Sequence, residues 1–251
     1  MKVLLIDTCG ATGSVVLADT DLSPAITASA TLPGRTASER LVPAIKQLTM
    51  PGGFELRSLD AVAVVIGPGS FTGVRVGLSA AKGLCEALNL PLVAISRLAV
   101  LAHLAAPPPA APVHALLDAG RGEFYYGEYL DGICLREALL TRDELLIALA
   151  HPSPDPGSVE HGAFLVASEP SVAQSVAELN PRLVADPTAE DALPLAIRRI
   201  HRAAFDDPAT LDANYLRRTD AEIFAKPRAS ALLSPGPRGN PKSIPGTRLD
   251  E

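Results

Sequence analysis

The stretch of residues 61–90 constrains the fold more than any other part of the chain. Residues 61–66 are almost wholly apolar, which favours a strand buried on both faces. Residues 67–73 read GPGSFTG and predict a tight, glycine-rich turn. Residues 74–88 then repeat apolar side chains at helical spacing. A strand, a glycine-rich turn and a helix in this order can direct backbone N–H groups toward a bound anion. The same sequence pattern also occurs where the glycines only allow close packing.

Composition narrows the class of protein. Hydrophobic residues make up 47% of the chain and aromatic residues only 4%, so the core must consist mainly of Ala, Val and Leu. With a net charge of −6, the chain has no overall basic character, so it is not expected to bind nucleic acid without a basic partner or a local basic patch. The three cysteines, Cys9, Cys85 and Cys134, have neither zinc-site spacing nor the even number of a disulfide framework. Without a signal-like or membrane-spanning run, we expect a soluble, cytoplasmic protein.

The element order predicts an α/β fold of two ribonuclease-H-like lobes. Short strands at residues 3–7, 14–18 and 25–32 favour an antiparallel meander. Thr36 and Glu39 form a capping box that opens a helix, although Pro43 should kink this helix or shift its start. After the central stretch come a strand at 92–95 and a helix at 96–105. Residues 1–105 therefore form the expected N-terminal lobe.

The second half of the chain repeats this pattern. The Pro-rich segment 106–112 is a stiff linker. A strand ending at Asp118, two further strands and a helix capped by Thr141 and Glu144 follow it. A helix at 189–204 is expected to complete this second lobe, whose predicted bounds are 113–222. Residues 223–251 are rich in Pro, Gly, Ser and Arg and are expected to form a disordered tail.

Common catalytic motifs are missing from the sequence. The glycine turn lacks the Lys of a phosphate-binding P-loop and the spacing of a nucleophile elbow. The five histidines are scattered singly, so no zinc-hydrolase helix is predicted. Two carboxylates end the first strands of the lobes, where a metal-bound phosphate can lie, but Asp also favours turns. The candidate contacts for an anion or nucleotide are Asp7, Gly67, Gly69, Ser70, Thr72, Gly73 and Asp118.

Several segments together resemble the bacterial TsaB (YeaZ) family, in the right order over roughly the first 222 residues. They read IDTCGATGSVVL, SERLVP, GPGSFTGVRVGLSAAKGL, PLVAIS, LLDAGRGEFYYGEY and NYLRRTDAE. The resemblance implies the two-lobed actin/hexokinase/Hsp70 (ASKHA) fold. It also implies a non-catalytic scaffold in the complex that forms N6-threonylcarbamoyladenosine on tRNAs reading codons that start with A. The catalytic partner would be TsaD, with TsaE completing the complex and tRNA contacted only through it.

The resemblance also bears on single positions. The TsaD paralogue carries an H-x-x-x-H metal pair, and the matching positions here are Arg97 and Leu101, which cannot ligate a metal. The family usually has His before the SER motif, and here Ala37 stands there. The resemblance therefore implies no metal and no cofactor of its own, with weak ATP or ADP binding left open.

The protein is expected to heterodimerise with TsaD through the helices that begin near residues 38 and 74. When TsaD is absent, the same surface is expected to form a homodimer. A small-residue stripe on the second helix suggests either docking to a partner or packing on its own sheet. If this stripe docks a partner, Ala81→Glu should abolish binding and leave the fold intact. The alternative function is an ASKHA-type nucleotide-binding enzyme, either an ATPase or phosphotransferase or a glycoprotease-like protein. The candidate interface residues are Leu41, Ile45, Leu78, Ala81, Cys85 and Leu88.

Overall fold

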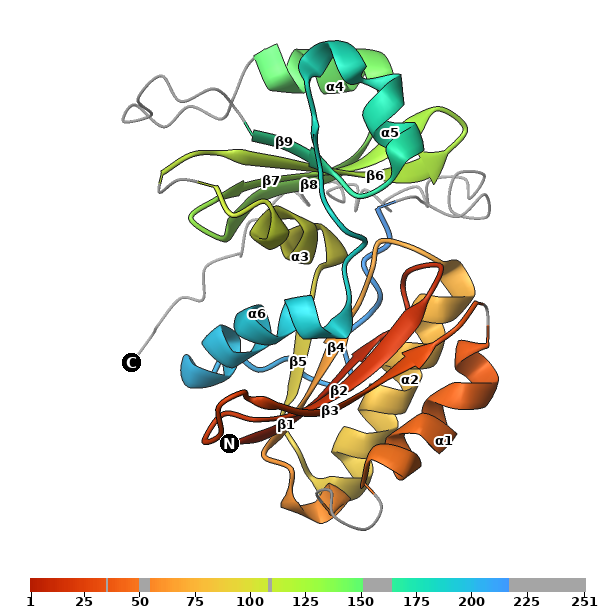
Figure 1. Cartoon of the computed structure of the whole chain (residues 1–251), viewed down its shortest axis with the longest axis vertical. Helices are drawn as coiled ribbons and strands as arrows, with labels where there is room; N and C mark the ends of the chain where they lie inside the picture. Colours follow the sequence, from red (N-terminus) through yellow and green to blue (C-terminus); the bar gives the residue numbers. More distant parts are fainter. Residues whose placement is uncertain (35, 50–54, 108–109, 151–163, 217–251) are drawn as a thin grey trace, which may run out of the picture. The chain divides into compact units, whose positions relative to one another are not determined.

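The computed structural model describes residues 1–34, 36–49, 55–107, 110–150 and 164–216. These residues contain two five-stranded sheets (Figure 1). In the first sheet, β1, β2 and β3 form an antiparallel meander, and β4 and β5 extend the sheet in parallel from the other side of β1. The strand order is β3-β2-β1-β4-β5. The strands are β1 (Lys2–Asp7), β2 (Gly13–Asp19), β3 (Ile26–Leu32), β4 (Ala61–Val65) and β5 (Leu92–Ile95).

The second sheet repeats this arrangement, which confirms the predicted duplication. Its first strand again pairs with an antiparallel hairpin on one side and with parallel strands on the other. The order is β10-β9-β6-β7-β8, which is the order of the first sheet read from the opposite edge. The strands are β6 (Val113–Gly120), β7 (Glu123–Leu130), β8 (Ile133–Thr141), β9 (Phe164–Ala167) and β10 (Arg182–Leu183).

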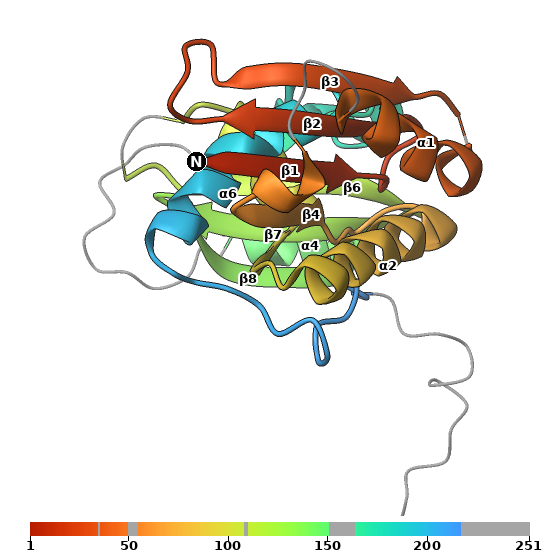
Figure 2. The ribbon, with the colours of Figure 1, turned by 90° about the horizontal axis from the view of Figure 1, so that it is seen from below.

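Helices cover both sheets. In the first lobe α1 (Ala37–Thr49) and α2 (Phe71–Leu88) lie side by side on one face (Figure 2). In the second, α4 (Arg142–Ala150) and α5 (Pro170–Ser175) pack on the sheet. Two further helices, α3 (Arg97–Leu104) and α6 (Ala189–His201), contact each other between the two sheets. Short 3-10 turns are formed by Leu56–Ser58 and Ala177–Leu179.

The two middle helices pack on the opposite sheets from those predicted. Helix α3 follows the first lobe in sequence, but its Leu98 and Leu101 share a core cluster with Val113 and Tyr129 of the second sheet. Helix α6 was expected to complete the second lobe, but its Leu193 belongs to the first sheet's core. Sequence periodicity identifies a helix and its apolar face, but it carries no information about which sheet that face will cover.

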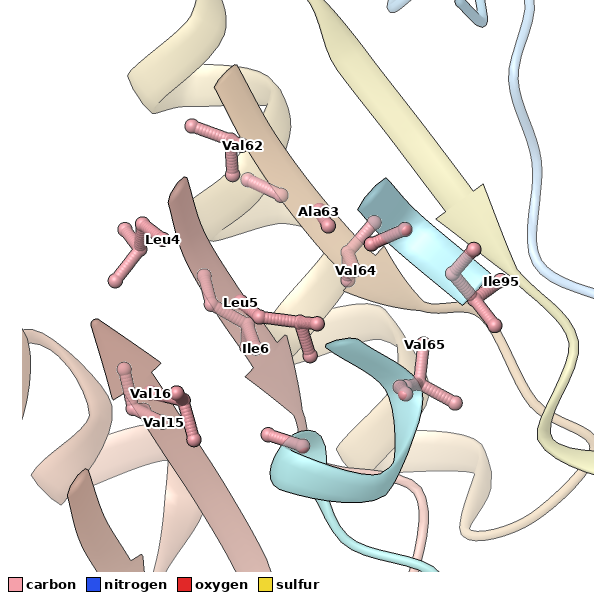
Figure 3. Close-up of a cluster of buried hydrophobic side chains, with 14 of the residues drawn as sticks. Leu4, Leu5, Ile6, Val15, Val16, Val62, Ala63, Val64, Val65 and Ile95 are labelled. Atoms are coloured by element: carbon pink, nitrogen blue, oxygen red, sulfur yellow. The ribbon is translucent and has the colours of Figure 1, made fainter. Parts of the chain in front are cut away.

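The centre of the first sheet is buried on both faces, as the apolar run predicted. All of β4 is buried, and neighbouring β1 is buried from Val3 to Asp7. Figure 3 shows their side chains packed with those of β2 and β5. A strand that is buried on both faces needs no polar alternation, which explains the continuous apolar sequence.

The predicted helix starts were partly right. Thr141 and Glu144 form the expected box, since Glu144 Oε2 accepts from Thr141 N and Thr141 Oγ1 accepts from Glu144 N. Thr36 Oγ1 instead donates to Pro33 O. Helix α1 begins at Ala37 and contains Pro43 in its interior.

Parts of the predicted domain layout lie outside the described residues, namely positions 108–109 of the linker and the whole tail from 217 onward. The bounds 1–105 and 113–222 therefore stay predictions. Within the described ranges, no helix combines the length and apolar character that crossing a bilayer requires.

Candidate functional site

The glycines of the central loop are required by close packing against the turn after β1. A Cβ atom added at Gly69, Gly73 or Gly77 would lie well under 3.0 Å from atoms of Cys9 or Thr8. Real Cβ atoms essentially never approach so closely. Two hydrogen bonds fasten the same contact, from Thr8 Oγ1 to Gly73 O (2.6 Å) and from Ser70 N to Cys9 O (2.8 Å). The turn therefore has a packing explanation that needs no bound anion.

The N-terminus of α2 is capped by the chain itself. Ser70 is the N-cap residue, and its Oγ accepts a hydrogen bond from Gly73 N (3.2 Å). This bond uses one of the free N–H groups that an anion would otherwise contact. Other N–H groups of the first turn remain, so the cap weakens the case for an anion site without removing it.

A cleft of about 930 Å³ lies beside the loop and reaches both sheets. Five of the seven predicted anion contacts line it, namely Gly69, Ser70, Thr72, Gly73 and Asp118. Gly67 and Asp7 are not among its lining residues. Its other walls include Cys9, Gly10, Arg97, Ser168, Glu169 and Asp186.

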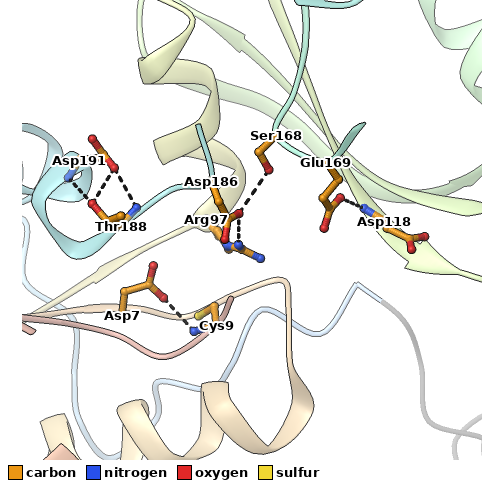
Figure 4. A network of polar contacts seen from close by, with 9 residues as sticks. All are labelled: Asp7, Cys9, Arg97, Asp118, Ser168, Glu169, Asp186, Thr188 and Asp191. Carbon is orange, nitrogen blue, oxygen red and sulfur yellow. Dashed lines mark hydrogen bonds and ion pairs between the residues drawn. The ribbon is translucent and has the colours of Figure 1, made fainter. Parts of the chain in front are cut away.

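Arg97 is the central charge of the cleft (Figure 4). It is only 5% exposed, and its Nη2 pairs with Asp186 Oδ1 at 2.5 Å. Its Nε is buried without a hydrogen-bond partner among the described residues. Gly10 leaves room for this guanidinium, since a Cβ there would lie 2.9 Å from Nη2. Arg97 is thus held as one half of a partly buried ion pair.

Carboxylates outnumber this single cation. Asp7 is 1% exposed and accepts from Cys9 N (2.8 Å), and burial raises its pKa although Arg97 opposes the shift. Glu169 accepts from Asp118 N (2.7 Å), and burial raises the pKa of Glu169 as well. Asp118 Oδ1 in turn accepts from Gly120 N, as in an Asx turn. A free polyphosphate entering this cleft would meet the lining carboxyl groups of Asp118, Glu169 and Asp186 but, among the lining residues, one guanidinium.

The positions that match a metal pair in TsaD have other roles here. Arg97 is committed to Asp186, and Leu101 is fully buried in the core of the second sheet. Across the described ranges, no group of three His, Cys, Asp or Glu residues is placed to hold a metal ion.

Five of the six predicted interface residues point into the protein and are not exposed to a partner in this structure, whereas the assignment of Leu88 stays a prediction. These five belong to the first sheet's core, and Leu88 is half-buried. An apolar stripe at helical spacing marks the face that a helix buries, and here it buries that face on its own sheet. The core residues are Leu41, Ile45, Leu78, Ala81 and Cys85.

The outward faces of the same helices carry a different set of residues. On α2, Thr72, Ser79 and Gly83 are exposed, and on α1 Val42 is 53% exposed. A Cβ at Gly83 would meet nothing within 4 Å. We call this surface of α1 and α2 the outer face. On α2 these side chains are small, whereas the α1 part of the outer face also exposes Glu39, Arg40 and Lys46.

Sequence reasoning missed an exposed cluster at the start of α2. The guanidinium carbon of Arg75 lies 3.4 Å from the Phe71 ring centroid, and its Nε donates to Tyr215 Oη at 2.7 Å. The two rings are 6.0 Å apart. Phe71 and Arg75 are four residues apart on one helix face, which is a detectable signal, but Tyr215 is 140 residues away in sequence.

The fold of this chain has solved counterparts. A Pseudomonas aeruginosa structure, described as an uncharacterized protein with similarity to peptidase YeaZ, matches with a TM-score of 0.67 and 30% identity. The match covers 86% of this chain and 99% of that one. The chain belongs to the TsaB (YeaZ) family. A second structure, YeaZ from Pseudomonas aeruginosa, gives a TM-score of 0.62 and 29% identity over 84% and 98% of the two chains. These matches confirm the predicted family and its two-lobed α/β fold.

Sequence relatives of the TsaB family agree with this placement. The tRNA threonylcarbamoyladenosine biosynthesis protein TsaB of Escherichia coli K12 is 35% identical over 130 residues, or 51% of this chain. The match spans 55% of that relative, and the one to TsaB of Haemophilus influenzae spans 40%. An uncharacterized protein of Mycobacterium tuberculosis is 30% identical over 84% of this chain and 96% of its own length. Residues 31–145 also match the family model of TsaD, described as tRNA N6-adenosine threonylcarbamoyltransferase.

Proposed function

We propose that this protein is an accessory, non-catalytic subunit in the formation of N6-threonylcarbamoyladenosine on tRNA. In this proposal it heterodimerises with the catalytic TsaD, and TsaE and the tRNA are reached through that complex. The names of the TsaB relatives support the pathway. The observation that carries the docking role is the outer face of α1 and α2, and above all Gly83.

Among the described residues, nothing packs closely enough on Gly83 to require a glycine there. A glycine inside a helix costs about 1 kcal/mol relative to alanine. At Gly73 and Gly77 the close approach of Thr8 accounts for that cost, but at Gly83 a Cβ would meet open space. A small residue on an exposed helix face lets a second backbone come close. The position therefore fits a docking helix better than a plain surface helix.

The partner should carry a similar pair of helices. The TsaD model matches residues 31–145, which contain both α1 and α2. Two proteins that share one element can pair through it about a pseudo-twofold axis, as two copies of one chain do in an isologous dimer. The shared helices therefore support TsaD as the partner. They also support a homodimer of this chain when TsaD is absent.

Gly83→Trp tests the docking role. The bulky side chain fills space on the outer face and should lower affinity for the cognate TsaD at least about tenfold, the equivalent of about 1.4 kcal/mol. Calorimetric titration with purified TsaD measures this change. Gln174→Trp places the same side chain on exposed α5 and serves as the matched control. Unchanged affinity in a folded Gly83→Trp variant would contradict the proposal.

The enzyme alternative rests on the cleft, whose 930 Å³ would accommodate a nucleotide. The surplus of carboxylates around Arg97 argues against it, so we propose no cofactor of the chain's own. Calorimetry of the isolated protein with ATP and magnesium tests this point. Tight binding that is lost in Asp7→Asn, or turnover of ATP by this chain alone, would favour the enzyme.

A further inference from the structure

A second groove, of about 650 Å³, lies apart from the cleft and shares none of its lining residues. It is formed by α6, the segment from the end of β5 into α3, and the turn between β7 and β8. Its volume falls within the range of small-molecule sites in proteins, about 300–1,000 Å³. The groove belongs neither to the proposed docking surface nor to the cleft, so neither explains its lining residues.

One side of the groove is apolar. Ile133 is 64% exposed at the hairpin, where an isoleucine gains nothing from contact with water. Ala99 and Leu195 continue the apolar wall. Tyr129 lines the groove as well, and its hydroxyl donates to Glu137.

The one carboxylate beside Tyr129 is already satisfied. Glu137 also accepts from Ser96 Oγ through Oε1 and from Asn214 Nδ2 through Oε2. With these donors, both carboxylate oxygens of Glu137 are engaged within the protein. The floor of the groove is thus rigid and presents no unpaired acceptor from this residue.

The other side of the groove is basic. Three arginines from the end of α6 line it, and they differ in their partners. Arg199 donates to Ala94 O and pairs with Asp206 at 3.2 Å. Arg198 and Arg202 make no side-chain hydrogen bond or ion pair with any residue of the described ranges. Arg198 in the last turn of α6 and Arg202, its C-cap residue four positions later, both line the groove.

The turn between β7 and β8 accommodates the first of these arginines. Gly132 has a φ of 75°, and a Cβ there would lie 2.6 Å from Arg198 Nη1. The charge of Arg198 is also felt by His103, since burial lowers the pKa of His103 and Arg198 lowers it further. Basic residues at a helix C-terminus complement the helix dipole, which accounts for their sign. It does not account for two unpaired guanidiniums facing an apolar wall in a concave site.

We propose that this groove binds a small organic anion, with a carboxylate or phosphate monoester held by Arg198 and Arg202 and an apolar body against Ile133, Ala99 and Leu195. Guanidinium groups suit both anions, because their donors match the paired oxygens of carboxylate and phosphate. Asp131 also lines the groove and keeps its charge, although its Oδ1 accepts from Ala110 N; the three lining arginines outnumber the two lining carboxylates, Asp131 and Glu137. This site extends beyond the proposed docking function and does not depend on it.

The test uses 8-anilino-1-naphthalenesulfonate, a fluorescent sulfonate with an aromatic body, as the probe. Titrated into the full chain, the probe should bind one saturable site. The Arg198→Ala/Arg202→Ala double variant should bind it at least tenfold more weakly, and Ile133→Asp should show a similar loss. Arg40→Ala/Arg57→Ala removes two exposed charges elsewhere and is the matched control. Circular dichroism checks that each variant is folded.

Competition separates the two anion classes. Displacement of the probe by adenosine monophosphate identifies a phosphate monoester site, and displacement by octanoate identifies a carboxylate site. Probe binding that is equal in wild type and the Arg198/Arg202 variant would overturn the proposal. An equal loss in the control pair, or displacement by neither competitor, would overturn it as well.

Discussion

The two lobes share one strand order but differ at the end of their first strand. In the first lobe β1 ends in Asp7, which is buried and accepts from Cys9 N. In the second β6 contains Asp118, which is exposed and closes its own turn onto Gly120. A symmetric phosphate site would need both carboxylates to face the cleft. Only Asp118 lines it, so duplication of the fold has not preserved a duplicated site.

The helices that follow the next parallel strand differ as well. After β4 comes α2, with 18 residues, three closely packed glycines or alanines on its inner side and an open outer face. After β9 comes α5, with only six residues. A six-residue helix has too little surface to dock a partner helix along its length. The proposed docking surface accordingly lies on the long helix of the first lobe.

Ala81→Glu should have the largest effect, because it places a charge in the core of the first lobe. Ala81 is fully buried against the sheet, and an unpaired buried charge costs roughly 3–5 kcal/mol. We expect most of the folded state to be lost in urea or thermal unfolding. Gly83→Glu, two residues further along on the outer face, is the control and should stay folded. A folded Ala81→Glu variant would mean that this face of α2 is not packed on the sheet.

Gly77→Ala and Gly83→Ala should move stability in opposite directions, although they make the same change in one helix. At Gly77 the new methyl group would press on Thr8 Oγ1, and overpacking costs typically about 1–3 kcal/mol. At Gly83 it meets nothing, so the better helix propensity should stabilise by up to about 1 kcal/mol. Chemical denaturation of the two variants measures the difference. Equal effects would remove the distinction between the inner and outer faces of α2.

The contrast between these glycines shows what the sequence could predict. Periodicity correctly located β4 and α2 and their order, because strand and helix periods are local properties. It could not tell whether the sheet or a partner protein covers the apolar face of α2, since Thr8, which contacts Gly73 and Gly77, lies more than sixty residues earlier. Because periodicity reports only local structure, it also could not predict the Arg75–Tyr215 contact or which sheets α3 and α6 cover. Apolar spacing marked a buried face, and only the fold shows what buries it.

The smallest predicted effects concern the pH dependence of the free energy of unfolding. One buried group in each lobe should change this free energy with pH, and the two changes should have opposite signs. Burial raises the pKa of Asp7 in the first lobe above its usual 3.8, so the folded state holds this proton more tightly than the unfolded state. Its contribution to the free energy of unfolding therefore falls as pH rises from about 3.8 through the folded pKa. Asp7→Asn should remove this dependence and keep an acceptor for Cys9 N.

His114 in the second lobe should behave in the opposite way. It is fully buried, with Nδ1 2.7 Å from Tyr126 Oη, and burial lowers its pKa below the usual 6.5 although Glu128 opposes the shift. As pH falls below 6.5 the unfolded state takes up a proton first, so the free energy of unfolding should fall, by at most about 1.4 kcal/mol per pH unit. His114→Phe should flatten this decline in urea titrations between pH 7 and pH 5. A wild-type slope retained in His114→Phe would show that His114 does not set this acid sensitivity.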